Sequence, residues 1–188
     1  PDRIEAGSFA ILAALLGNDL KITDCRPEHL ESLIIQLESA GVEVRRGDTW
    51  LKISRPKKIR AASITTAVYP GFATDLQSPF AVLLTQAEGE SKVFETVFEG
   101  RLHYLEELRR MGANVIPCDP HRAIIIGPNK LRGRMMESPD LRAGLAFVIA
   151  ALIAEGQSEI HNVFHIDRGY AQIEKRLQAV GAKIERVT

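Results

Sequence analysis

Three strongly apolar segments recur along the 188-residue chain, and each predicts a buried helix that runs into a strand. They begin at Ile4, Leu76 and Leu141 and read IEAGSFAILAALLGNDLKI, LQSPFAVLLTQAEGESKV and LRAGLAFVIAALIAEGQSEI. Because apolar side chains occupy nearly every face of these helices, protein must enclose them on all sides, and we expect them to pack as a bundle. Each helix is expected to end at a glycine, namely Gly17, Gly89 and Gly156.

A second, amphipathic helix follows each buried one. In HLESLIIQLESAG, the apolar residues fall at helical spacing on one face, whereas the glutamates lie elsewhere. One face should therefore pack on a sheet and the other should contact water. A further glycine, 23 to 25 residues after the first, is expected to end each second helix in a left-handed conformation: Gly41, Gly112 and Gly181. Strands are expected at 42–45, 50–54, 114–117 and 123–126.

Two landmarks that agree in three copies predict an internal repeat. We expect a single mixed α/β (α+β) domain over residues 1–188, built of three repeats at about 1–68, 69–135 and 136–188. The third repeat stops at 183–188 after only one strand, whereas the earlier repeats have two or more. Since the chain also opens on PDRIEAGSF without an initiator Met, we expect the completing strand to come from chain outside this sequence.

Charge and composition exclude several classes of protein. The 24 Lys and Arg residues balance 24 Asp and Glu residues, so the chain lacks the basic excess typical of nucleic-acid binding. A hydrophobic content of 45% suits a globular core rather than disorder. The longest apolar run, 143–154, has 12 residues, fewer than the roughly 18 that cross a bilayer. We therefore expect no nucleic-acid or membrane partner, and no leader sequence indicates export.

No motif predicts a metal or another cofactor. The two cysteines, Cys25 and Cys118, lie far apart in the sequence and are expected to be reduced thiols. The five histidines form no HExxH or HxH pattern. The sequence also contains no serine-hydrolase elbow, no P-loop and no dinucleotide-binding glycine motif.

Charged residues gather in the segments that join the repeats, at 69–77, 95–103, 138–144 and 165–170. Loops on a rigid scaffold commonly hold functional residues. Asp75 and Asp140 directly precede the second and third buried helices, where a carboxylate can cap the helix N-terminus. A carboxylate there could also act as a base toward a bound hydroxyl, and the two roles are compatible.

Three arginines lie in or beside the same segments: Arg101, Arg142 and Arg168. Guanidinium groups suit bidentate recognition of phosphate or carboxylate, so three of them near helix starts favour an anionic ligand. The alternative is a structural network in which these arginines pair with nearby carboxylates, namely Glu99, Asp140 and Asp167.

These segments contain the motifs of a known family. PDRIEAGSF, YPGFATDLQ, FEGR, DLRAG and HIDRGY closely resemble the UDP-N-acetylglucosamine enolpyruvyl transferases, and the shikimate-pathway enolpyruvyl transferases are a weaker match. The resemblance covers essentially the whole chain. It implies the C-terminal half of a two-domain enzyme with the inside-out α/β barrel of this family, three repeats of sheet and helix around internal helices.

The resemblance also implies an activity: transfer of the enolpyruvyl group of phosphoenolpyruvate to the 3′-hydroxyl of UDP-N-acetylglucosamine, with release of phosphate. This cytoplasmic reaction is the first committed step of peptidoglycan synthesis, and so serves cell-wall biogenesis, cell shape and cell division. It needs no cofactor. The partner implied is the N-terminal domain of the same polypeptide.

The resemblance assigns roles residue by residue. Asp75 matches the proposed base toward the sugar hydroxyl, Val97 matches a backbone contact to the substrate, and Arg168 matches an arginine of the phosphoenolpyruvate site. Further substrate-binding positions in the same cleft match Arg101, Asp140 and Arg142.

The sequence departs from the family pattern at three places: Gly100 replaces the Asn of FENR, Ala73 replaces a Pro, and Ser78-Pro79 replace Ala-Gln. None of these changes removes a charged group. The family's mobile catalytic loop lies in the half that is absent here, so the isolated chain is predicted to be inactive. Two alternatives stay open, a non-catalytic ligand-binding or scaffolding module and the shikimate-pathway enzyme.

Overall fold

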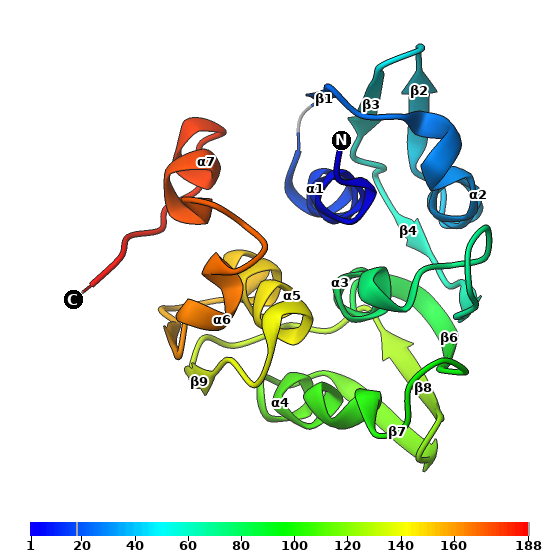
Figure 1. The fold of residues 1–188 in the computed structure, drawn as a ribbon. Helices are drawn as coiled ribbons and strands as arrows, with labels where there is room; N and C mark the ends of the chain where they lie inside the picture. Colours follow the sequence, from blue (N-terminus) through cyan, green and yellow to red (C-terminus); the bar gives the residue numbers. More distant parts are fainter. Residues whose placement is uncertain (18, 188) are drawn as a thin grey trace.

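Three helices form the centre of the molecule, and the sheets and outer helices surround them (Figure 1). The structure, a computed structural model, describes residues 1–17 and 19–187. The central helices are α1 (Arg3–Leu16), α3 (Gln77–Leu84) and α5 (Leu141–Ile153). Helix α3 packs against both α1 and α5, and most residues of all three helices are buried. The predicted bundle of buried helices is therefore confirmed.

The ends of these helices differ from the prediction. Helix α1 does end at Gly17, whose N–H donates to the carbonyl of Ala13. Gly89, however, lies inside strand β6 (Ala87–Phe94), and Gly156 lies three residues beyond the end of α5. The expected helix end at Gly89 is wrong because Ala87 already pairs with Ile59 of a neighbouring strand, so the chain enters the sheet before it reaches the glycine.

The outer helices follow the predicted pattern. They are α2 (Glu31–Ser39), α4 (Leu105–Arg110) and α7 (Ile173–Ala179). In α2 the buried residues Leu33, Ile34 and Leu37 form one face, as the amphipathic pattern predicts. The glycine after each helix has a positive φ: +90° at Gly41, +106° at Gly112 and +94° at Gly181. These glycines are needed because a left-handed backbone is costly for residues with a Cβ.

Most strands lie in two sheets. The first sheet contains β1 (Leu20–Thr23), β3 (Trp50–Ser54) and β2 (Glu43–Arg46), all antiparallel, in that order. The second contains five strands: β4 (Ile59–Arg60), β5 (Ser63–Thr65), β6, β7 (Asn114–Asp119) and β8 (Arg122–Gly127). All four predicted strands are confirmed within one or two residues at their ends.

Parallel pairs join successive parts of the chain. Strand β4 follows the β2–β3 hairpin but pairs in parallel with β6, which follows α3. In the same way, β9 (Met135–Glu137) follows the β7–β8 hairpin and pairs in parallel with β10 (Glu159–His161), which follows α5. The order of helix, strand, helix and hairpin thus occurs twice before α5. The repeat boundaries near residues 68 and 135 stay a prediction.

After α5 the chain has a different course. Strand β10 is followed by α6 (Phe164–Asp167) and α7, and residues 182–187 lie in no strand. Thr188, the last residue of the expected segment 183–188, lies outside the described residues. The Arg186 guanidinium pairs with the carboxylates of Asp167 and Glu174, which fixes this segment against α6 and α7. Within residues 1–17 and 19–187, no helix is both long and apolar enough to cross a membrane.

Candidate active site at the starts of the buried helices

The N-terminal ends of α3 and α5 lie side by side and are joined directly. The Ser78 hydroxyl, in the first turn of α3, donates to the carbonyl of Arg142 in the first turn of α5, at 3.1 Å. Helix α1 joins them through Tyr170, whose hydroxyl lies 3.0 Å from the Ser8 hydroxyl of α1 and 3.4 Å from Nη1 of Arg142. This arrangement brings the charged connections before α3 and α5 together.

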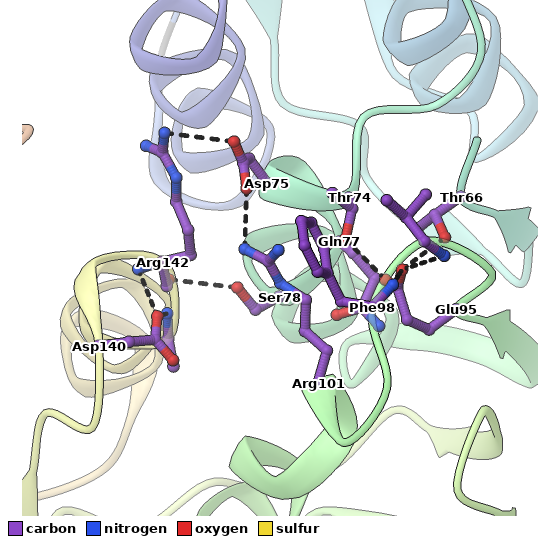
Figure 2. Close-up of polar contacts among 12 residues, drawn as sticks. Thr66, Thr74, Asp75, Gln77, Ser78, Glu95, Phe98, Arg101, Asp140 and Arg142 are labelled. Atoms are coloured by element: carbon purple, nitrogen blue, oxygen red, sulfur yellow. Dashed lines mark hydrogen bonds and ion pairs between the residues drawn. The ribbon is translucent and has the colours of Figure 1, made fainter. Parts of the chain in front are cut away.

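Asp75 lies between two guanidinium groups (Figure 2). Nη2 of Arg101 lies 2.8 Å from its Oδ1, and Nη2 of Arg142 lies 3.3 Å from its Oδ2. The Asp75 side chain is 33% exposed and both arginines are 20% exposed, so water and ligands can still reach the group. We call these three residues the Asp75 cluster. Its formal charge is one positive unit, because two guanidinium groups face one carboxylate.

The prediction that Asp75 caps the second buried helix is wrong. Asp75 lies in a short 3-10 turn, Thr74–Leu76, that precedes α3; the N-cap position of α3 is Leu76, and the helix has no side-chain cap. The turn places Asp75 one residue too early to reach the free N–H groups of α3. Its carboxylate is therefore available to Arg101 and Arg142.

Asp140, in contrast, is a helix cap. Its Oδ1 accepts the backbone N–H of Arg142 at 2.7 Å and that of Ala143 at 2.9 Å. The expected ion pair between Asp140 and the Arg142 side chain is absent among the described residues, because the Arg142 guanidinium points to Asp75 (Figure 2). The capping interpretation of Asp140 is confirmed, and its contact with a ligand stays a prediction.

Arg101 is oriented by its neighbours in the loop 96–100. Its guanidinium lies 5.0 Å from the centre of the Phe98 ring, a cation–π contact, and does not pair with Glu99 in the part of the chain that the structure describes. Gly100 has a φ of +70°. Since Asn and Gly are the residues that adopt this left-handed conformation most readily, Gly at the family's Asn position preserves the backbone that leads into Arg101.

The two remaining predicted residues lie differently. The Val97 N–H donates to Oε1 of Glu95 at 2.8 Å, so this amide is already used within the chain. Arg168 is exposed at the end of α6 and has no ion pair among residues 1–17 and 19–187. The expected pair with Asp167 is wrong because Asp167 binds Arg186 instead.

The segment of Arg168 nevertheless lies against the start of α5. Tyr170, two residues later, is fully buried and contacts Arg142. Gly169 permits this approach, because a Cβ at that position would lie 2.8 Å from a methyl carbon of Leu141. Burial raises the pKa of Tyr170, while its contacts with Ser8 and Arg142 act in the opposite direction. The Tyr170 hydroxyl thus stays protonated and neutral beside Arg142.

Several polar residues of the candidate site, all buried except the half-buried Thr74, were missed by sequence analysis: Thr66, Thr74, Gln77, Glu95 and Tyr104. A signal for Glu95 was present, because Ser91 and Val93 alternate on the inward face of β6 and Glu95, directly after the strand, continues this alternation. A carboxylate in such a position must have internal partners. Burial and the nearby Glu95 carboxylate raise the pKa of Tyr104 well above its usual value.

Among the described residues, no cysteine or histidine side chain pairs with the Asp75 cluster. Both cysteines are free thiols, as predicted, with Cys25 buried and Cys118 exposed. Burial raises the pKa of the Cys25 thiol. In the described part of the chain, no three side chains of His, Cys, Asp or Glu gather in a way that could hold a metal ion.

Comparisons with known proteins agree with the motifs. A family model described as EPSP synthase (3-phosphoshikimate 1-carboxyvinyltransferase) matches residues 1–177. A UDP-N-acetylglucosamine 1-carboxyvinyltransferase of Solibacter usitatus is 48% identical over 187 residues, which cover 99% of this chain and 44% of the relative. A protein of the same name from Halothermothrix orenii is 46% identical, over 100% of this chain and 45% of the relative. The chain thus spans less than half the length of these curated relatives.

Solved structures show the same fold. The enolpyruvyl transferase NikO from Streptomyces tendae superposes with a TM-score of 0.91 at 28% identity, over 98% of this chain and 44% of NikO. EPSP synthase from Acinetobacter baumannii superposes with a TM-score of 0.71 at 19% identity, over 98% of this chain and 46% of that protein, a likeness of fold alone. The predicted resemblance to the UDP-N-acetylglucosamine enolpyruvyl transferases is confirmed. Since the family model matches residues 1–177, the chain belongs to the EPSP synthase (3-phosphoshikimate 1-carboxyvinyltransferase) family.

Proposed function

We propose that this chain forms one wall of the active site of a UDP-N-acetylglucosamine 1-carboxyvinyltransferase. The curated relatives that match nearly its whole length at 43% to 48% identity have this name. The observation that supports the proposal most directly is the position of Asp75, held between Arg101 and Arg142 at the starts of two buried helices. A base and an anion-binding surface are thus adjacent.

The proposed reaction uses these groups in an addition and an elimination. The 3′-hydroxyl oxygen of UDP-N-acetylglucosamine bonds to C2 of phosphoenolpyruvate, its proton passes to Asp75, and C3 gains a proton from a separate acid. The bond from C2 to the phosphate oxygen then breaks, C3 loses a proton, and the C2–C3 double bond forms again. A positioned carboxylate suits the first proton transfer because it can accept the hydroxyl proton as the new bond forms.

The arginines have the complementary task. One positive charge remains in the Asp75 cluster after pairing, and the exposed Arg168 guanidinium adds another near the Tyr170 segment. Guanidinium groups bind the phosphate and carboxylate groups of phosphoenolpyruvate in bidentate geometry. Asp140 and the Val97 backbone would contact the sugar nucleotide. No cofactor is needed for this chemistry.

The rest of the proposal concerns the full-length protein. The three repeats would form the C-terminal half of a two-domain enzyme, and the N-terminal domain of the same polypeptide would supply the acid at C3. The reaction would be the first committed step of peptidoglycan synthesis, in the cytoplasm. Addition and elimination require base and acid around one substrate pair, so this chain alone should be inactive.

The test measures phosphate release from phosphoenolpyruvate by the full-length product of the native gene. UDP-N-acetylglucosamine and shikimate 3-phosphate are offered separately as acceptors. With the sugar nucleotide, Asp75→Asn should lower kcat about 100-fold or more and change KM far less, because the amide cannot take the proton. Asp48→Asn, in the exposed turn between β2 and β3, is the matched control.

The possible results separate the alternatives. Unchanged turnover in Asp75→Asn removes Asp75 from the mechanism. If phosphate is released only with shikimate 3-phosphate, the acceptor is the one named in the description of the matching family model. If a folded full-length protein releases no phosphate with either acceptor, a non-catalytic ligand-binding module becomes the better interpretation.

A further inference from the structure

Glu95 is a fully buried carboxylate with a complete set of donors around it. Its side chain is 0% exposed. Oε1 accepts the Thr66 hydroxyl at 3.0 Å, the Val97 N–H at 2.8 Å and the Phe98 N–H at 3.0 Å. Oε2 accepts the Thr74 hydroxyl at 2.8 Å. Because a buried charge is costly without such partners, four donors that converge on one carboxylate indicate a defined task.

The backbone of the sheet holds Glu95 in place. Its N–H donates to the carbonyl of His121 at 2.8 Å, at the turn between β7 and β8. Its side chain points inward with those of Ser91 and Val93. The backbone of Glu95 is therefore held at the end of β6, where its carboxylate meets the loop that follows.

Two connections lead from Glu95 to the Asp75 cluster (Figure 2). The first passes through Thr74, which binds Oε2 and directly precedes Asp75 in the 3-10 turn. The second passes through the Phe98 N–H, since the Phe98 ring packs on the Arg101 guanidinium and Arg101 pairs with Asp75. Glu95 thus fixes both the segment that contains Asp75 and the loop that orients its partner.

We propose that Glu95 is a positioning residue for Asp75 and Arg101, an inference that rests on the proposed function. Because its side chain is fully buried, Glu95 does not touch the substrates. It acts by keeping the Asp75 carboxylate and the Arg101 guanidinium in one geometry, which proximity effects in catalysis require. The shape of the side chain and its acceptors matter for this task more than its charge.

Two substitutions distinguish shape from charge in the full-length enzyme. Glu95→Asp keeps the charge but shortens the side chain, so the carboxylate cannot reach all four donors. We expect kcat to fall about 10- to 100-fold, with a smaller change in KM. Glu95→Gln keeps the length, its amide oxygen can replace Oε1, and the Thr74 hydroxyl can turn to accept from the new amide group, so kcat should stay within about threefold.

A matched control lies on β6, the strand that directly precedes Glu95. Glu90→Asp shortens an exposed side chain of β6 and should leave kcat unchanged. If Glu95→Asp does not fold, a second pair of variants tests the same inference. Thr74→Val removes the hydrogen bond to Oε2 of Glu95, whereas Thr74→Ser keeps it. Only valine should then lower kcat.

The inference about Glu95 can fail while the proposed function holds, and the two failures give different results. The inference is wrong if a folded Glu95→Asp enzyme keeps its kcat, or if Glu95→Gln loses as much activity as Asp75→Asn. Crystal structures of wild type and Glu95→Asp, or of wild type and Thr74→Val, give a readout that needs no activity. A variant that keeps the 2.8 Å contact between Arg101 and Asp75 contradicts the inference, and one that loses it supports the inference even if wild type releases no phosphate.

Discussion

Two groups of arginines and carboxylates in this molecule have opposite composition. In the Asp75 cluster, two guanidinium groups share one carboxylate. In the second group, which we call the Arg186 cluster, one guanidinium binds two carboxylates, those of Asp167 and Glu174. The first leaves a positive charge available for an anionic ligand, whereas the second leaves none. In our proposal, the number of partners per guanidinium, rather than the presence of an ion pair, distinguishes the anion-binding surface from a structural contact.

The positions of the clusters strengthen this contrast. The Asp75 cluster lies at the starts of buried helices and is connected to the interior through Glu95 and Tyr170. The Arg186 cluster lies on the surface, with Arg186 37% and Asp167 38% exposed. Exposed pairs are typically worth less than about 1 kcal/mol, so the Arg186 cluster should contribute little to stability.

The largest expected effect comes from a matched pair of arginine substitutions. Arg142→Ala should lower kcat/KM about 100-fold or more, because it removes a charged donor from the proposed phosphoenolpyruvate surface. Arg186→Ala removes the same side chain from the Arg186 cluster and should change kcat/KM by less than about threefold. Both are measured by phosphate release from the full-length enzyme. Equal losses in the two variants would show that the contrast between the clusters has no functional meaning.

An intermediate effect is expected at Asp140, which lies beside the Asp75 cluster but caps α5. Asp140→Ala should reduce the free energy of unfolding by about 1 kcal/mol, because two helix N–H groups lose their acceptor. Asp140→Asn should change it by only a few tenths of a kcal/mol, since Asn is an equally good cap. Urea titration of the full-length protein measures both. If Asn also weakens binding of UDP-N-acetylglucosamine, the charge of Asp140 has a role in binding beyond the cap.

The smallest effect is a pH dependence in the Arg186 cluster. The hydrogen bond from Arg186 lowers the pKa of Asp167 from its usual 3.8. A folded-state pKa below the unfolded value means that the stabilisation is present above about pH 4 and disappears as pH falls through the folded pKa. Because the pair is more than one-third exposed, solvent screening limits it to a few tenths of a kcal/mol.

Asp167→Asn should remove this dependence. The measurement compares urea midpoints of wild type and variant at about pH 6 and about pH 3, because this range spans the unfolded pKa of Asp. Asp48→Asn is the control. A difference between wild type and Asp167→Asn that is the same at both pH values would contradict the assignment.

Local patterns predicted much of the fold. The buried helices, the amphipathic α2, the left-handed glycines and four strands follow from side-chain periodicity and backbone preferences, which are local properties. The end of the second buried helix was wrong because a long-range pairing, Ala87 with Ile59, begins before Gly89. Residues 182–187 form no strand; Arg186 binds two carboxylates, and the Gln178 side chain donates to the carbonyl of Ile184.

The candidate site, like the fold, could be predicted only as far as local sequence patterns reach. The arginines and Asp75 were identified, but the expected partners were neighbours in sequence, such as Glu99 and Asp167. The observed partners come from other elements, because the tertiary arrangement of the buried helices determines which side chains meet. Gly100, which replaces the family's Asn, is a case where the structure explains the sequence. Its left-handed φ accounts for this replacement, which the periodicity of the sequence could not explain.

The parallel pairs β4–β6 and β9–β10 have a consequence for folding. Each one places a strand from one part of the chain in the same ladder as a strand that follows the next buried helix. Linear repeat proteins can lose a terminal unit while their neighbours persist, because each unit contacts only the adjacent ones through a flat interface. Here separation of one unit would break backbone hydrogen bonds in a sheet of the next and expose the shared helical core. The three parts should therefore unfold in a single cooperative transition.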